Sequence, residues 1–146
     1  MTKILYKEES FRILGACFEV YNQKGFGFTE PVYQECLAFE FAMQAIPFVS
    51  QPEIKLTYKG NVLSQYFKPD FICYDRIIVE LKTVSAIVDA HRAQTINYLN
   101  ALNFELAILV NFGQHPKLSY ERLANSNRGR NAETISDEIR SWMNEK

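Results

Sequence analysis

The sequence has no long hydrophobic run. Its longest apolar stretches, residues 77–79 and 106–110, are far shorter than the roughly 20 residues that cross a bilayer, which excludes a membrane-spanning helix. Cysteine is also scarce, with three residues and no CxxC pair, so we expect buried free thiols rather than a disulfide framework or a metal cluster. The N-terminal segment places charges where a signal peptide needs apolar residues, which predicts a cytoplasmic protein.

An excess of positive charge is missing too. The net charge is −1 at pH 7, which argues against a protein that holds nucleic acid by bulk charge. Any nucleic-acid role must therefore rest on metal ions and a local basic rim, for which the candidates are Arg92, Lys117, Arg122, Arg128 and Arg130. The hydrophobic content of 47% over 146 residues is ample for a packed core, and we expect a single domain over residues 1–146.

Apolar spacing indicates the helical segments. A 3.6-residue period predicts a helix over residues 6–23. Residues 30–45 are predicted as a second helix, with Thr29 as its cap and Pro31 in its first turn. The expected core face of the first helix is Phe11, Leu14, Cys17, Phe18 and Tyr21, and that of the second is Tyr33, Leu37 and Phe41.

From Pro47 the hydrophobic period changes to two residues, which predicts antiparallel strands over 54–58, 62–67, 69–74 and 77–82. A helix over 86–102 and an apolar strand over 105–112 follow, with an edge strand near 118–123. A helix between two apolar strands implies a right-handed crossover. We therefore predict an α/β fold with a mixed central sheet flanked by helices over about residues 8–123, a polar loop over 124–132 and a C-terminal helix over 133–145.

Charged residues interrupt the apolar strand over 77–82. Glu80 and Lys82 are two residues apart, so their side chains leave the same face of the strand. Charges on a buried strand are costly unless they are paired or bound to a metal. A second Glu-x-Lys, at Glu53 and Lys55, lies beside Pro52 in a polar stretch and is read as an exposed edge.

Whether Asp70 joins this pair depends on the turn between the two strands. A two-residue turn would place Asp70 opposite Leu81, facing away from Glu80. A three-residue loop over 74–76 would pair Asp70 with Glu80 and put all three charged side chains on one face. We predict the three-residue loop.

Two opposed carboxylates repel each other, and a divalent cation removes that penalty. We expect Asp70, Glu80 and the Leu81 carbonyl to hold Mg²⁺ or Mn²⁺, which would activate a water toward a phosphodiester. Lys82 would orient that water or stabilise the developing charge. Glu30 would complete a second metal position, although an acid in the first turn of a helix is common for dipole reasons alone.

These residues resemble the PD-(D/E)xK nuclease superfamily. Its motif matches Pro69-Asp70 followed, after nine residues, by Glu80-Leu81-Lys82. Within the superfamily, residues 27–33 (GFTEPVY) resemble the motif of the small prokaryotic GxxExxY proteins, and residues 94–98 (QTINY) resemble the QxxxY motif of RecB-like nucleases. The resemblance covers about residues 8–123.

The resemblance implies a restriction-endonuclease-like α-β-β-β-α-β core and Mg²⁺-dependent hydrolysis of DNA. It implies catalytic roles for Glu30, Asp70, Glu80 and Lys82, with Gln94 and Tyr98 steadying the site or the substrate. Some RecB-like relatives carry an iron–sulfur cluster on four cysteines, and this chain has neither that number nor that spacing.

The sequence leaves two hypotheses about the function open. The leading one is a DNA nuclease that uses a metal-activated water, with RNA as another possible substrate. The alternative is a non-catalytic module that binds nucleic acid or protein and retains the nuclease fold. The mild acidity favours that module, or an enzyme that works as a homodimer or in a larger assembly. Tyr33 is predicted to be core, and His91 a solvated surface residue.

Overall fold

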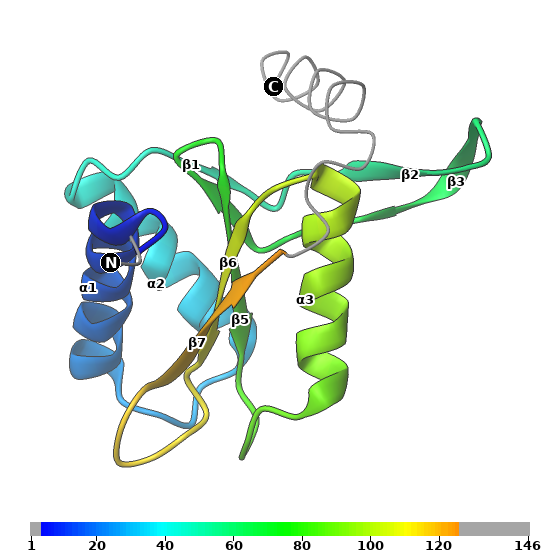
Figure 1. Ribbon diagram of the computed structural model, residues 1–146. Helices are drawn as coiled ribbons and strands as arrows, with labels where there is room; N and C mark the ends of the chain where they lie inside the picture. The colour runs from blue at the N-terminus through cyan, green and yellow to red at the C-terminus, as the bar shows by residue number, and fades with distance from the viewer. Residues whose placement is uncertain (1–3, 126–146) are drawn as a thin grey trace.

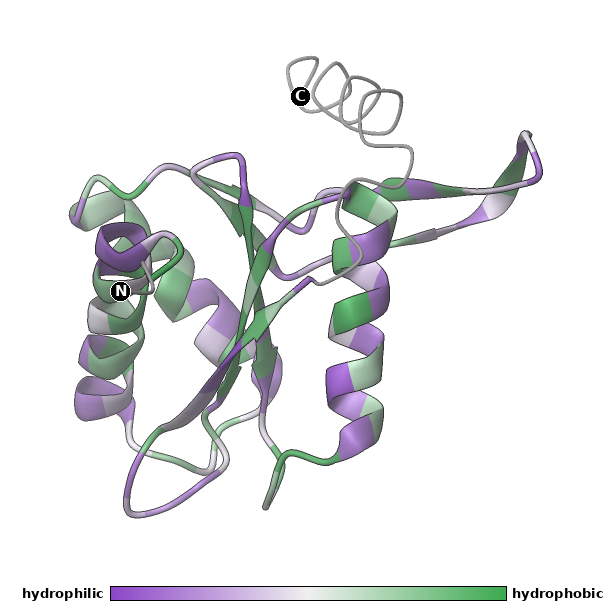
Figure 2. Cartoon of the chain, in the orientation of Figure 1, coloured by the Kyte–Doolittle hydropathy of each residue, from purple (hydrophilic) through white to green (hydrophobic). Residues whose placement is uncertain are grey.

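A computed structural model describes residues 4–125. These residues form three layers, with a central sheet between helices (Figure 1). Helices α1 (Lys7–Lys24) and α2 (Glu30–Met43) cover one face of a five-stranded sheet, and helix α3 (Asp89–Leu102) covers the other. One apolar cluster fills the space between the sheet and α1 and α2, and a second lies under α3. Figure 2 shows the hydrophobic colouring concentrated in the central strands between these helices.

The sheet has the strand order β1-β4-β5-β6-β7. Its members are β1 (Phe48–Ser50), β4 (Phe71–Cys73), β5 (Ile77–Lys82), β6 (Leu106–Asn111) and β7 (Ser119–Ala124). β5 and β6 pair in parallel across the α3 crossover, and the other neighbours are antiparallel. The predicted mixed sheet flanked by helices is confirmed, with β6 in the interior and β7 at the edge.

The predicted strands over 54–58 and 62–67 are present, but the prediction that they continue into the central sheet was wrong. Within residues 4–125, β2 (Ile54–Tyr58) and β3 (Asn61–Phe67) pair only with each other, as a hairpin separate from the central sheet. The place beside β4 is taken by β1, a three-residue strand that the sequence did not indicate. Such a short strand has too few residues to show a two-residue period.

The buried face of α1 also differs from the prediction. Cys17 and Tyr21 are buried as expected, whereas Phe11 is 78% exposed and Phe18 39% exposed. Their expected places in the core are filled by neighbouring positions of the helix, namely Ile13, Ala16 and Val20. The helix is therefore rotated about its axis relative to the face that hydrophobicity alone selects. The predicted face of α2 is confirmed, since Tyr33, Leu37 and Phe41 are fully buried.

The three cysteines are free thiols. Cys17 and Cys73 are buried free thiols, as predicted, and Cys36 is half-buried. No helix within residues 4–125 is long and apolar enough to cross a membrane. The predicted loop over 124–132 and the helix over 133–145 lie outside the described residues, apart from positions 124 and 125.

The segment after β5 is fastened to the end of β6. Asn111 is fully buried, and its side chain donates to the Val84 carbonyl at 2.8 Å and accepts from the Val84 N–H at 3.0 Å. Gly113 lies so close that an added Cβ would come within 2.5 Å of the Val84 nitrogen and 2.6 Å of the Thr83 carbonyl carbon. This contact holds the residues that directly follow Lys82.

Gly113→Ala is expected to lower the free energy of unfolding by about 1–3 kcal/mol, because the new methyl group overlaps backbone atoms that cannot rotate away. Gly15→Ala is the matched control, since an added Cβ there meets nothing within 4 Å and alanine favours the helix by about 1 kcal/mol. Urea unfolding of both variants measures the contrast. Equal midpoints for the two would contradict the close contact at Gly113.

Candidate active site

The turn between β4 and β5 sets the geometry of the site. Cys73 pairs with Ile77 and Phe71 with Val79, so the connecting loop has three residues and the prediction of an odd-length loop is confirmed. Tyr74 and Asp75 in this loop both adopt a left-handed conformation, with φ of 56°. The next position along this register places Asp70 beside Glu80.

Asp70 and Glu80 each bind the backbone of the other's segment. The Asp70 N–H donates to Glu80 Oε1 at 2.7 Å, and the Leu81 N–H donates to Asp70 Oδ2 at 2.7 Å. Glu80 is only 5% exposed. Within residues 4–125 the second oxygen of each carboxylate makes no hydrogen bond, so each acid keeps one hard oxygen that could serve as a ligand.

The ionisation of these acids shows which charges surround them. Burial raises the pKa of Glu80 well above its ordinary value, and Asp70 and Glu30 add to this while Lys82 opposes it. Burial also raises the pKa of Asp70 to about 6; the Leu81 N–H and Lys82 act against the rise and Glu30 adds to it. Glu30, Asp70, Glu80 and Lys82 therefore lie close enough to interact electrostatically.

α2 brings Glu30 to the site through Tyr33. The Tyr33 hydroxyl donates to the Gly25 carbonyl at 2.5 Å, and its ring stacks on Phe112 with centroids 4.6 Å apart. Tyr33 is fully buried, so its predicted core role is confirmed, and it holds the turn from which α2 begins. Thr29 is the N-cap residue but makes no side-chain capping bond, contrary to expectation.

Gln34 is a site neighbour that the sequence did not reveal. Its Nε2 donates to the Asp70 carbonyl at 3.0 Å and to Ser50 Oγ at 3.1 Å. With Glu30 and Asp70 it lines a cleft of about 450 Å³. Its position one turn after Glu30 was the available signal, but its partner Ser50 belongs to the unpredicted strand β1.

Gln34→Ala is expected to lower the free energy of unfolding by about 1–2 kcal/mol, because two hydrogen bonds that tie α2 to the Asp70 segment are lost. Gln23→Ala is the control, since among the described residues Gln23 bonds only Glu19, on the exposed side of α1. Denaturant unfolding of the pair is the measurement. A loss no greater than that of Gln23→Ala would show that Gln34 does not support the site.

α3 contributes Gln94 and Tyr98 from the opposite side. Lys82 Nζ donates to Gln94 Oε1 at 3.4 Å. Tyr98 stacks on Phe67 with centroids 4.4 Å apart, and its pKa is raised by burial and by the charges of Glu80 and Asp70. Both residues therefore face the charged cluster.

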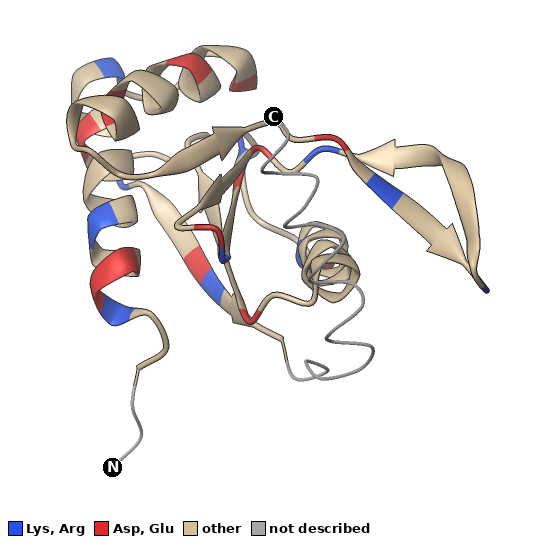
Figure 3. Cartoon of the chain, turned by 90° about the horizontal axis from the view of Figure 1, so that it is seen from above, with Lys and Arg blue, Asp and Glu red and all other residues tan. Residues whose placement is uncertain are grey.

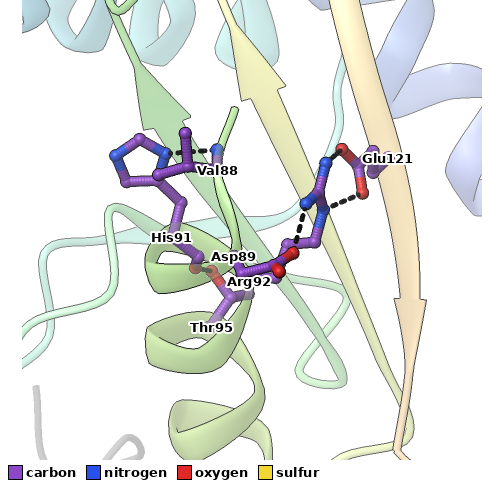
Figure 4. Close-up of polar contacts among 6 residues, drawn as sticks. All are labelled: Val88, Asp89, His91, Arg92, Thr95 and Glu121. Atoms are coloured by element: carbon purple, nitrogen blue, oxygen red, sulfur yellow. Dashed lines mark hydrogen bonds and ion pairs between the residues drawn. The ribbon is translucent and has the colours of Figure 1, made fainter. Parts of the chain in front are cut away.

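Two other polar residues of α3 are structural (Figure 4). His91 Nδ1 accepts from the Val88 N–H at 3.1 Å and closes the start of the helix. Arg92 binds both carboxylate oxygens of Glu121 at 2.7 and 2.8 Å and also binds Asp89. Because two acids already occupy its guanidinium, Arg92 is not a free member of a basic rim, and that expectation was wrong.

The other four candidates for the basic rim differ in their surroundings. Arg122 donates to the Leu5 carbonyl, and Lys117 is exposed in the loop before β7. Arg128 and Arg130 lie outside the described residues. No continuous basic rim is therefore formed by these candidates within residues 4–125.

The carboxylates of Asp70 and Glu80 are the candidate ligands for a divalent cation. No three His, Cys, Asp or Glu side chains in the described part of the chain converge to surround an ion by themselves. Mg²⁺ sites commonly use only one or two carboxylates, with waters and substrate phosphates completing the shell. Asp70 and Glu80 meet that need, because Glu80 is buried and Asp70 half-buried and each keeps one oxygen without a hydrogen bond among the described residues. A cation offsets the cost of placing two acids together.

Comparisons with known proteins identify the family and the fold. The family described as the PD-(D/E)XK nuclease superfamily matches residues 7–123. The chain is similar to a solved structure titled "Crystal structure of SSO0001", with a TM-score of 0.52 and 16% identity over 97% of this chain and 66% of that one. This likeness concerns the fold alone, and the chain spans just under two thirds of that protein. No curated protein matches the chain.

Proposed function

The chain belongs to the PD-(D/E)XK nuclease superfamily, and from this we propose that it hydrolyses phosphodiester bonds of DNA with a divalent metal ion at Asp70 and Glu80. The observation that carries the proposal is the register of β4 and β5, which sets these two acids against each other beside Lys82. The GFTEPVY segment, from which Glu30 and Tyr33 come, supports a place in the GxxExxY group.

Each side chain has a role in this proposal. Asp70, Glu80 and the Leu81 carbonyl hold Mg²⁺ or Mn²⁺, and Glu30 serves a second position. The bound cation supplies Lewis acidity toward the scissile phosphate and lowers the pKa of water. Lys82 donates a hydrogen bond to a phosphate oxygen, which stabilises the negative charge of the transition state, or it orients the attacking water.

The α3 residues position these groups. Gln94 accepts one hydrogen of the Lys82 ammonium and leaves the others available for substrate. Burial and the charges of Glu80 and Asp70 raise the pKa of Tyr98, and a phenol is protonated at neutral pH even without such a shift. Its hydroxyl therefore remains a hydrogen-bond donor, suited to a phosphate oxygen.

The test incubates purified protein with linear, circular and single-stranded DNA and with RNA, in Mg²⁺, in Mn²⁺ and in EDTA. Cleavage of DNA in either metal and none in EDTA is the expected result. Cleavage of RNA alone would transfer the substrate class to RNA. No cleavage of any substrate by folded protein would contradict a nuclease that acts by itself.

One observation favours a second candidate. The net charge is −1, and Arg92 is neutralised by Glu121 and Asp89, so the chain as a whole has no excess of positive charge and Arg92 supplies none. A non-catalytic binding module, or an enzyme completed by a second copy or by a larger assembly, would fit that deficit. Binding without cleavage in the same assay would favour this candidate.

A further inference from the structure

The β2–β3 hairpin stands apart from the rest of the fold. Figures 1 and 3 show it extending from the body beside α3. The two strands pair only with each other, and Lys59 and Gly60 form the turn with φ of 49° and 81°. The central sheet gains no strand from this hairpin, so its outer half has no evident part in the core.

The base of the hairpin is attached to the proposed active site. Ile54 and Phe67 are buried in the cluster under α3, and Phe67 stacks on Tyr98. Three residues beyond Phe67 the chain reaches Asp70. A molecule that lies along the hairpin therefore meets the acid cluster at its inner end.

The exposed part of the hairpin combines positive charge with aromatic rings. Residues 54–68 contain three lysines and no acid, and Figure 3 shows blue on β2 and at the tip, and no red on either strand. Tyr58 is 62% exposed and Tyr66 is 50% exposed. The chain as a whole carries a net charge of −1, so this is a local reversal of sign.

Lysine and tyrosine lie next to each other at two places. Lys55 pairs directly with Tyr66 across the strands, so both side chains leave the same face. At the tip, Lys59 Nζ lies 5.4 Å from the centre of the Tyr58 ring. Lys68 forms an ion pair with Glu53 at 3.6 Å, whereas no ion pair among residues 4–125 involves Lys55 or Lys59.

We propose that the β2–β3 hairpin binds an unpaired nucleic-acid strand and leads it to the acid cluster. Lys55 and Lys59 contact backbone phosphates, and Tyr58 and Tyr66 stack on bases. Cations that follow the backbone, combined with aromatic platforms, characterise proteins that bind single strands. Duplex DNA keeps its bases stacked on one another, so it offers the phosphates but not the ring faces. Only the delivery to the cleavage site rests on the proposed function.

Binding is measured by fluorescence anisotropy with a labelled single-stranded DNA and with the same sequence as a duplex, in EDTA so that no cleavage occurs. The double variant Tyr58→Ala/Tyr66→Ala is expected to bind the single strand about tenfold or more weakly and to bind the duplex unchanged. Lys55→Ala/Lys59→Ala is expected to reduce the slope of log affinity against log salt by about 1.4, from two phosphate contacts on a single strand.

Lys7→Ala/Lys24→Ala removes the same charge from the two ends of α1, and it serves as the control. The proposal would be overturned if the hairpin variants lost no more single-strand affinity than this control. It would also be overturned if the wild-type protein bound neither the single strand nor the duplex. A third result would also overturn it: the wild type is a dimer, the tyrosine variant is a monomer, and both bind DNA equally well. The hairpin would then serve self-association.

Failure of the nuclease proposal remains distinguishable from failure of this one. Glu80→Gln is expected to lose cleavage and keep single-strand binding, whereas the hairpin variants lose binding in EDTA. If wild-type protein cleaves nothing, the anisotropy measurement still decides the role of the hairpin.

Discussion

Glu80→Gln is expected to lower the rate of metal-dependent DNA cleavage by about a thousandfold or more. The amide keeps an oxygen that can accept the Asp70 N–H, so the β4–β5 geometry is preserved. It removes the negative charge that holds the cation, and the Lewis acidity lost is worth several kcal/mol of transition-state stabilisation. Single-turnover rates at saturating DNA and Mg²⁺ measure the effect.

The chain provides a matched control for this substitution. Glu53 begins a second Glu-x-Lys, but it is exposed and paired with Lys68, so Glu53→Gln is expected to cleave at nearly the wild-type rate. Lys82→Ala is expected to slow cleavage without removing the metal-dependent rise in melting temperature, because Lys82 is not a ligand. Equal cleavage by wild type and Glu80→Gln would contradict the assigned site.

Without metal, the contribution of Asp70 to the free energy of unfolding is expected to fall as pH rises from about 4 to about 6. Its pKa is raised from 3.8 to about 6 in the folded protein, so the folded state binds more protons than the unfolded state in this interval. Stability therefore decreases with rising pH there. The shift corresponds to about 3 kcal/mol once the carboxyl is fully ionised.

Asp70→Asn isolates this effect. In EDTA the variant is expected to match wild type near pH 4 and to exceed it by about 3 kcal/mol near pH 7, since the amide does not ionise. Asp75→Asn, in the exposed β4–β5 turn, is the control and is expected to track wild type throughout. Denaturant unfolding at a series of pH values measures both.

Divalent metal is expected to reverse the trend in wild type. Mg²⁺ competes with protons for Asp70 and Glu80, so its stabilising effect should be absent near pH 4 and should grow through pH 6. Removal of the metal with EDTA should lower the wild-type melting temperature at pH 7 and leave that of Asp70→Asn unchanged. Equal metal stabilisation of both proteins would show that the ion binds elsewhere.

Much of this site was predictable because its signals are local. Glu80 and Lys82 interrupt an apolar strand at a spacing that places both on one face. The odd-length loop followed from requiring Asp70 to join them, and the pairing of Cys73 with Ile77 confirms it. The α3 crossover and the parallel pairing of β5 with β6 followed from a helix between two apolar strands.

Long-range contacts were not predictable in the same way. Gln34 supports Asp70 only because α2 lies against β1, and β1 is three residues long. Arg92 appeared available for phosphate until Glu121, 29 residues away, was placed beside it. Phe11 and Phe18 have the hydrophobicity of core residues, yet the rotation of α1 against the sheet leaves them exposed.

The sequence by itself determined the order of the longer helices and strands, which acids and lysine to expect on one strand face, and the length of the turn between β4 and β5. These depend on side-chain period and loop length, which involve residues close together in the chain. Only the tertiary structure decided that β2 and β3 leave the sheet as a free hairpin, which helix face is buried, and which charges are already paired. Those outcomes depend on packing between segments far apart in the chain, and local spacing carries no record of such contacts.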